Sequence, residues 1–326
     1  MTTSAASGTT ASTPAAADAG YGELRAQLAG LATEAFRPEL AEIDRLSTPE
    51  IARIMNGEDQ SVASAVAERL PEIAAAIDAV ADRMARGGRL IYAGAGTAGR
   101  LGVLDASECP PTFNTDPSEV VGLIAGGPSA MVKAVEGAED SKELAAADLD
   151  GLGLTADDTV VGISASGRTP YAIGAVEHAR AAGALTLGLS CNADSALAAA
   201  AEHGLEVVTG PELLTGSTRL KAGTAQKLVL NMISTITMIR LGKTYGNLMV
   251  DVRASNEKLQ ARSRRIVSLA TGASDAEIES ALAATGGEVK HAILIVLGQV
   301  DGPTAARLLS ESQGHLRAAL AAASAL

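Results

Sequence analysis

Five short apolar runs, separated by segments with helical spacing, are the feature of this 326-residue chain that most restricts its fold. Continuous apolar strands are buried on both faces, which is typical of a parallel sheet whose crossover helices cover both sides. The chain therefore predicts an α/β fold, a doubly wound five-stranded parallel sheet. The expected strands are 89–93, 120–125, 159–164, 185–190 and 205–208, and the expected helices are 98–107, 129–135, 170–182, 195–201 and 222–240. Ligands of such sheets bind beyond the carboxyl ends of the strands.

The segments on either side of this pattern predict further helices. Ser47 or Thr48 before Pro49 and Glu50 is typical of a helix start, and a long helical pattern runs from 62 to 86. Several short helices are expected after residue 270. We therefore expect a disordered tail over 1–20, rich in Ala, Ser and Thr, then a main domain with N-terminal helices over 21–270, and a small helical module over 271–326.

Composition excludes several classes of function. Aromatic residues make up only 2% of the chain and the net charge is −12, so binding to a nucleic acid is not expected. Two cysteines and four scattered histidines give no disulfide framework and no metal site. The sequence has no apolar stretch long enough to cross a membrane, and its start does not resemble a signal peptide. We expect a cytoplasmic protein without a metal or membrane partner.

The first expected strand runs into a glycine-rich loop at residues 94–100, Gly-Ala-Gly-Thr-Ala-Gly-Arg. This spacing matches a dinucleotide-binding loop, but the second strand ends in Leu-Ile-Ala-Gly-Gly at 123–127, without the carboxylate that binds a ribose. A tight turn without a ligand is the plainest alternative. The loop also suits an anion at a helix start, with Gly96, Thr97 and Arg100 as candidate binding residues.

The third expected strand ends in a second loop of this kind, Ser-Ala-Ser-Gly-Arg-Thr-Pro at 164–170. Its hydroxyls can donate to phosphate oxygens, and both loops should open on the same edge of the sheet. We therefore predict a phosphate monoester ligand. The candidates in this loop are Ser164, Ser166, Arg168 and Thr169; Ser217 and Lys221, ahead of the last long helix, could neutralise the anion or could simply be solvated.

The Ser-x-Ser-Gly-x-Thr loop resembles that of the sugar isomerase (SIS) domain family, whose members bind phosphosugars. The longer motifs at 43–48, 104–112, 134–141, 215–227 and 246–252 resemble those of the N-acetylmuramic acid 6-phosphate etherase family. The resemblance extends from about residue 33 to the C-terminus. It implies a flavodoxin-like SIS domain as the catalytic domain and a UBA-like C-terminal module.

This resemblance also implies an activity, a lyase reaction that cleaves a lactyl ether by elimination and hydration in cell-wall amino-sugar recycling. The family uses no metal or organic cofactor, and its two catalytic glutamates correspond to Glu108 and Glu139. Such chemistry needs one carboxyl group to remove a proton and another to assist departure of the ether oxygen. The resemblance further implies a homodimer whose small-molecule phosphosugar site lies near the subunit interface.

Two other functions remain open at this point. An SIS aldose–ketose isomerase would need a base, but not the Asp-Ala-Ser-Glu-Cys-Pro-Pro block at 105–111. A non-catalytic SIS phosphosugar sensor could keep the hydroxyl loops and lose the glutamates. Without the resemblance, Glu139 would read as part of a solvated helix face. The presence of both glutamates favours the enzyme.

Overall fold

A computed structural model describes residues 28, 30–133, 135–252 and 257–326. The tail expected over 1–20 lies outside the described residues. The main domain is expected to begin at residue 21, and the described residues begin at residue 28.

The five predicted strands form one parallel sheet, as the sequence pattern indicates. The strands are β1 (Leu90–Gly94), β2 (Val120–Ile124), β3 (Thr159–Ile163), β4 (Leu185–Ser190) and β5 (His203–Glu206), in the order β2-β1-β3-β4-β5. β1 pairs with β2 on one side and β3 on the other, so Leu90 lies opposite both Val120 and Thr159. β2 is added on one side of β1, and the chain then returns to add β3, β4 and β5 on the other side. The order of strands therefore switches between β1 and β3, and ligands of such sheets bind in the crevice at this switch point.

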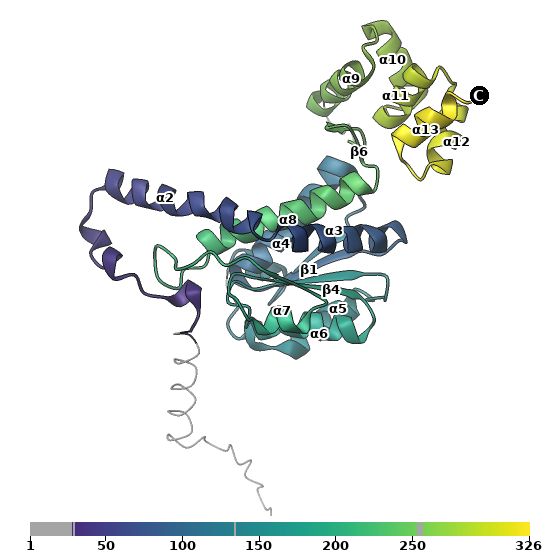
Figure 1. The fold of residues 1–326 in the computed structure, drawn as a ribbon. Coiled ribbons are helices and arrows are strands. Elements are labelled where there is room, and N and C mark those ends of the chain that lie inside the picture. Colours follow the sequence, from purple (N-terminus) through teal and green to yellow (C-terminus); the bar gives the residue numbers. More distant parts are fainter. Residues whose placement is uncertain (1–27, 29, 134, 253–256) are drawn as a thin grey trace, which may run out of the picture.

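Two layers of helices cover the sheet (Figure 1). The helices on one face are α3 (Leu70–Ala85), α4 (Gly96–Phe113) and α8 (Lys221–Arg240), and those on the other are α5 (Lys142–Gly151), α6 (Pro170–Ala181) and α7 (Ala196–Ala200). Successive strand residues point to opposite faces. Tyr92 therefore joins the core under α3, α4 and α8, while Ile91 and Ala93 join the core under α5 and α6.

The N-terminal part contains two helices where the sequence suggested one long pattern from 62 to 86. α2 (Thr48–Ala67) begins with a capping box in which Ser47 and Glu50 satisfy each other's backbone N–H groups. α2 ends before Arg69, and α3 begins at Leu70 with a proline in its first turn. Ahead of α2, the chain forms three short 3₁₀ turns, η1 (Ala32–Glu34), η2 (Pro38–Leu40) and η3 (Ile43–Arg45).

α4 is longer than the helix predicted over 98–107, which was expected to end before Pro110. It continues through Pro110 and Pro111 to Phe113 and ends at Asn114, which has the left-handed φ of 52°. Each proline removes one helical hydrogen bond. Burial of Cys109 and Phe113 in the core favours the longer helix. The helix expected over 129–135 is instead a 3₁₀ turn, η4 (Pro128–Met131), followed by η5 (Ala138–Asp140).

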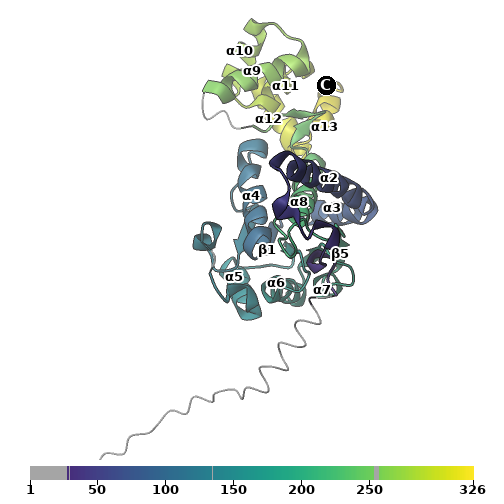
Figure 2. The same ribbon diagram turned by 90° about the vertical axis from the view of Figure 1, so that its left-hand side faces the viewer.

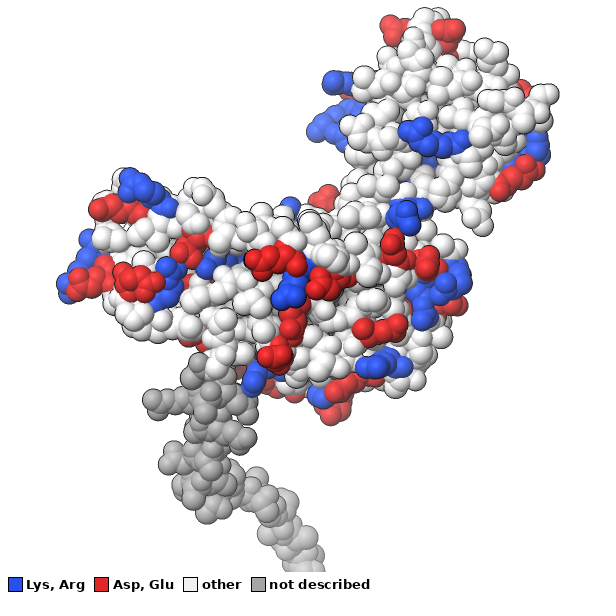
Figure 3. Space-filling view, viewed as in Figure 1, with Lys and Arg blue, Asp and Glu red and all other residues white. Residues whose placement is uncertain are grey.

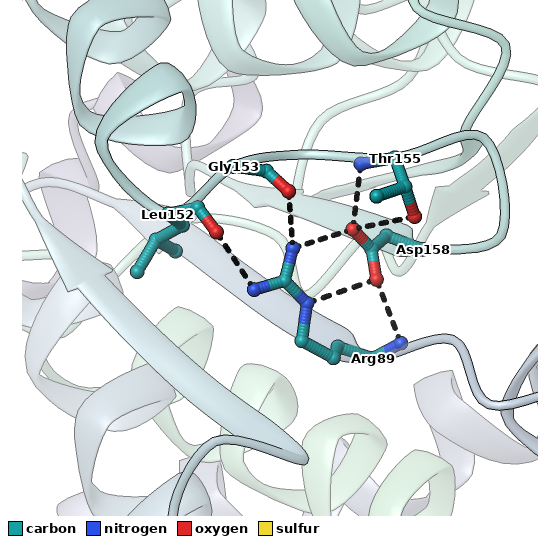
Figure 4. Close-up of polar contacts among 5 residues, drawn as sticks. All are labelled: Arg89, Leu152, Gly153, Thr155 and Asp158. Atoms are coloured by element: carbon teal, nitrogen blue, oxygen red, sulfur yellow. Dashed lines mark hydrogen bonds and ion pairs between the residues drawn. The ribbon is translucent and has the colours of Figure 1, made fainter.

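A clasp of polar groups joins β1 and β3 at the ends opposite the ligand-binding edge (Figure 4). The Asp158 carboxylate accepts from the Arg89 backbone N–H at 2.9 Å and from its guanidinium at 2.7 and 3.0 Å. The same guanidinium donates to the carbonyls of Leu152 and Gly153, and the Thr155 backbone N–H donates to Asp158 at 2.8 Å. The clasp therefore fixes the loop before β3 against the start of β1.

The C-terminal part has a core of its own. A hairpin of β6 (Thr244–Tyr245) and β7 (Leu248–Met249) leads to α9 (Glu257–Thr271), α10 (Asp275–Ala284), α11 (Val289–Gly298), α12 (Gly302–Glu311) and α13 (Leu316–Ala323). α9 packs on α10 and α11, so the helical module includes residues before the expected boundary at 271. It lies beyond the end of α8, where Lys290 donates to the Gly242 carbonyl (Figures 1 and 2).

No single helix in the described part of the chain is long and apolar enough to cross a membrane; only α11 and α12 taken together, bent by 107°, would pass on length and composition.

Candidate active site

A cleft of about 900 Å³ opens at the carboxyl ends of β1 and β3. Six segments contribute to its wall: the loop after β1, the loop after β3, the turn η5, the segment from the loop after β4 into α7, the start of α8 with the residues before it, and the N-terminal segment near residue 31. Its polar lining residues are Glu34, Thr97, Glu139, Asp140, Ser164, Ser166, Arg168, Thr169, Asp194, Ser195, Thr218 and Gln226. The two predicted phosphate loops and one of the two predicted glutamates therefore meet at one site.

The loop after β3 is organised by its own hydroxyl groups. The buried Ser164 hydroxyl is hydrogen-bonded to Thr169 Oγ1 at 2.8 Å and to Ser166 Oγ at 3.2 Å, and accepts from the Gly167 N–H at 3.1 Å. Ser166 and Thr169 are partly exposed toward the cleft. Ser164 thus sets the shape of the loop, and Ser166 and Thr169 present hydroxyls to a ligand.

Only glycine fits at position 167 of this loop. Its φ is +69°, and a Cβ atom there would lie 2.3 Å from Ser195 Cβ. The loop is also tied to the segment that follows β4, because Asn192 Nδ2 donates to the Ala165 carbonyl at 2.9 Å. The backbone therefore approaches the site closely and is held there.

The loop after β1 places the start of α4 at the cleft. Gly94 and Gly99 pack closely, since a Cβ atom on Gly99 would lie 2.6 Å from the Gly94 carbonyl oxygen. Gly96 begins the helix with φ +54°, and none of the described side chains caps it. The first N–H groups of α4 and the Thr97 hydroxyl can therefore serve an anion.

Glu139 reaches the cleft from η5. This short turn follows Gly137, whose φ is +74°, and its Ala138 is buried in the core under α6. Glu139 and Asp140 are exposed and face the same cleft as the hydroxyls of the second phosphate loop. A carboxyl group thus lies beside the loop that the sequence predicts to bind phosphate.

Four other predicted binding residues do not line this cleft. Arg100 donates to the carbonyls of Ala130 and Met131 at 2.8 and 2.9 Å, so it holds η4 in place. Lys221 is buried, and its ammonium forms a 2.6 Å ion pair with Glu58 of α2. Neither Gly96 nor Ser217 contributes to the wall, although both lie next to residues that do.

Glu108 lies far from this cleft in the same chain. It is twelve residues beyond Gly96 in α4, and at 1.5 Å per residue the two are about 18 Å apart along the helix axis. Its exposed side chain lines a second cavity of about 510 Å³, formed by the far ends of α4 and α8 and by the β6–β7 hairpin. One chain therefore does not bring the two predicted glutamates to one ligand.

The second cavity contains a buried carboxyl group, Asp105. It accepts hydrogen bonds from Tyr92 Oη and Asn231 Nδ2, each at 2.7 Å, and from Ser234 Oγ at 3.2 Å. Burial raises the pKa of Asp105, and these hydrogen bonds offset only part of that effect. Burial also raises the pKa of the neighbouring Cys109 thiol to about 12, which leaves it un-ionised at neutral pH.

Sequence reasoning missed the cleft residues that arrive from distant segments. Glu34 lies there because the Thr33 backbone N–H donates to Asn192 Oδ1 and Asn192 Nδ2 donates to Thr33 Oγ1, across 159 residues of sequence. Nothing local in the sequence indicates this contact. Gln226 lies within the motif at 215–227 that resembles the etherase family, and its place in that motif is the signal that could have identified it.

Acidic and basic side chains are interspersed over the face shown in Figure 3. Several acidic and basic residues of the described chain form ion pairs, such as Arg37 with Glu58 at 2.6 Å. Such a mixed surface does not favour a polyanion, which needs a continuous basic region. It agrees with a small ligand that is recognised inside a cleft.

Known proteins resemble this chain over most of its length. A family model described as the SIS domain matches residues 141–236, and one described as the glucokinase regulatory protein N-terminal SIS domain matches residues 72–180. A protein of Streptomyces avermitilis named N-acetylmuramic acid 6-phosphate etherase is 86% identical, covering 92% of this chain and 96% of its own. Proteins of the same name from Streptomyces coelicolor and Mycolicibacterium smegmatis are 83% and 55% identical, covering 92% and 90% of this chain and 97% and 99% of their own.

Proposed function

This chain belongs to the N-acetylmuramic acid 6-phosphate etherase family, and from that premise we propose how its cleft carries out the family's reaction. The enzyme is a carbon–oxygen lyase that cleaves the D-lactyl ether of N-acetylmuramic acid 6-phosphate. Its products are N-acetylglucosamine 6-phosphate and D-lactate, formed in amino-sugar recycling. The observation that carries the assignment of the site is the presence of Glu139 in the same cleft as both phosphate loops.

The phosphate group binds between the two loops. Ser166 and Thr169 donate hydroxyl hydrogen bonds, and the N–H groups at the start of α4, with Thr97, add further donors. Arg168 lines the same wall and supplies positive charge. With the phosphate held there, the sugar extends toward Glu139 and the start of α8.

The elimination then requires two proton transfers, and the hydration that follows it requires two more. A base removes the C2 proton, which is acidic because C2 is adjacent to the C1 aldehyde of the open-chain sugar. The C3–oxygen bond breaks, and the departing lactate oxygen receives a proton. Water then adds to C3 of the unsaturated intermediate, and C2 regains a proton. Glu139 and Glu108 share these transfers as base and acid.

Glu108 performs its part from a second copy of the chain. It lies about 18 Å along α4 from the phosphate loop of its own chain, too far to reach a substrate bound there. A homodimer that places Glu108 of one subunit beside Glu139 of the other completes the site. Ser217 and Lys221 would then support the start of α8 rather than contact the phosphate.

The competing functions are less well supported. A phosphosugar sensor needs no carboxylates, yet both glutamates are present in this chain.

A phosphorylated sugar does not cross membranes freely, and we therefore place the enzyme in the cytoplasm.

The test measures lactate release and the positions of isotope labels in the two products. In deuterated and ¹⁸O-labelled water, N-acetylglucosamine 6-phosphate should carry deuterium at C2 and the heavy oxygen at C3, while the lactate hydroxyl stays unlabelled. Glu108→Gln and Glu139→Gln should each abolish most lactate release and keep the fold. A variant that still exchanges the C2 proton retains the base. Near-normal lactate release by both variants would overturn the carboxylate assignment.

A further inference from the structure

One buried amide group in the cleft has no hydrogen-bond partner in the part of the chain that the structure describes. Among the described residues, five buried side-chain polar atoms lack a hydrogen bond, and four of them are threonine hydroxyls. The fifth is Nε2 of Gln226, a residue that is only 1% exposed. Of the five residues, Gln226 alone lines the active-site cleft.

An unpaired buried amide destabilises a folded protein, because it gives up water and gains nothing in return. Gln226 could be replaced by an apolar residue of similar size without loss of packing if it served the fold alone. The Nε2 donor is therefore positioned for a hydrogen-bond acceptor that the free protein does not contain. In the wall of the cleft, that acceptor belongs to a bound ligand.

The ligand atom that it meets is not on the phosphate. α8 begins at Lys221, and the fully buried Glu212 carboxylate accepts from the N–H groups of Lys221 and Ala222, both at 3.0 Å. A carboxylate therefore already occupies the start of α8 and repels a second anion there. Gln226 lies one turn further along this helix, where an uncharged acceptor fits.

We propose that Gln226 is a substrate-positioning residue whose amide donates a hydrogen bond to an oxygen atom of the sugar part of the bound phosphosugar. The inference rests on the proposed function. The hydrogen bond from Gln226 orients the carbon chain of the sugar relative to Glu139 while the two loops hold the phosphate.

The test compares two substitutions in α8, Gln226→Met and Thr237→Val. Each replaces an unpaired buried polar group by an apolar group of similar shape, and Thr237 lies outside the cleft. Both variants should keep or raise the Tm. Gln226→Met should weaken binding of N-acetylglucosamine 6-phosphate about 10-fold by calorimetry and raise KM for the substrate, with competitive inhibition by inorganic phosphate changed less than about twofold. Thr237→Val should change none of these.

Two further ligands and one further variant make the outcome decisive. Glucose 6-phosphate lacks the acetamido carbonyl, so a penalty confined to N-acetylglucosamine 6-phosphate assigns the contact to that carbonyl, and a penalty for both assigns it to another sugar oxygen. Gln226→Leu replaces Gln226→Met should the latter fail to fold. Unchanged sugar-phosphate affinity, or an equal loss for inorganic phosphate, overturns the proposal. Absence of lactate release by the unmodified enzyme would instead refute the proposed function.

Discussion

Ser164 and Ser166 are two residues apart in one loop, yet their hydroxyl groups have different roles. Ser164 is buried and holds the loop together, while Ser166 faces the cleft. Ser166→Ala should therefore raise KM by about 10- to 100-fold with a smaller effect on kcat, since it removes one hydrogen bond to a charged group. Steady-state kinetics check this, with Ser324→Ala at the C-terminal cap of α13 as a control. An unchanged KM would contradict the phosphate assignment.

Lys221 shows how a residue chosen for its charge can serve the fold. Its ammonium pairs with Glu58, and burial would raise the pKa of Glu58, but hydrogen bonds from Lys221 and Arg37 keep it below its ordinary value. Lys221→Met should lower the free energy of unfolding by about 1–2 kcal/mol and leave KM unchanged. Denaturant unfolding and kinetics test both parts, with exposed Lys227→Met as the control on the same helix. A selective rise in KM would restore Lys221 to the binding site.

At the scale of secondary structure, the clasp between β1 and β3 gives the fold a pH-dependent contribution. Burial would raise the pKa of Asp158, but hydrogen bonds from Arg89 and from backbone N–H groups outweigh it, so the pKa lies below its ordinary value. A carboxylate whose pKa is lowered by folding stabilises the protein above its unfolded pKa of about 4. That stabilisation is lost as the pH falls through the lower, folded pKa.

Asp158→Asn should therefore cost about 3 kcal/mol of unfolding free energy at neutral pH, and the difference from the unmodified protein should shrink below about pH 4. Urea unfolding at several pH values measures this. Its neighbour Asp157, exposed and 3.8 Å from Arg86, provides the control Asp157→Asn, for which little change is expected. A difference that stays constant down to pH 2 would show that the charge of Asp158 is not responsible.

The sequence predicted the sheet well because each parallel strand is buried on both faces, which leaves a continuous apolar run. It misjudged α4 because prolines normally end a helix, and the packing of Cys109 and Phe113 that favours the longer helix is tertiary. It made Lys221 a candidate for the anion because Glu58, with which the Lys221 ammonium pairs, is 163 residues away in the sequence. Contacts between residues so far apart leave no local pattern in the sequence. Loops suited to phosphate do leave one, a short motif of glycine and hydroxyl residues.

At the scale of the whole molecule, a site shared between two copies makes a measurable prediction. Glu108→Gln and Glu139→Gln proteins should each be inactive alone. After they are unfolded and refolded together, half of the dimers are mixed, and each mixed dimer has one site with both glutamates intact. About a quarter of normal lactate release should return. Light scattering should show a dimer throughout; an active monomer, or no recovery in mixed dimers, would contradict the shared site.

The length of α4 therefore has a consequence for inheritance. In the proposed dimer, one helix carries a phosphate-binding loop for its own substrate and an acid or base for the neighbour's, so that no single polypeptide contains a complete active site. Two null alleles, one altered at Glu108 and the other at Glu139, would complement each other in a cell that carried both. Two alleles altered at the same glutamate would not, and a genetic cross could thus sort mutations by the end of α4 at which they act.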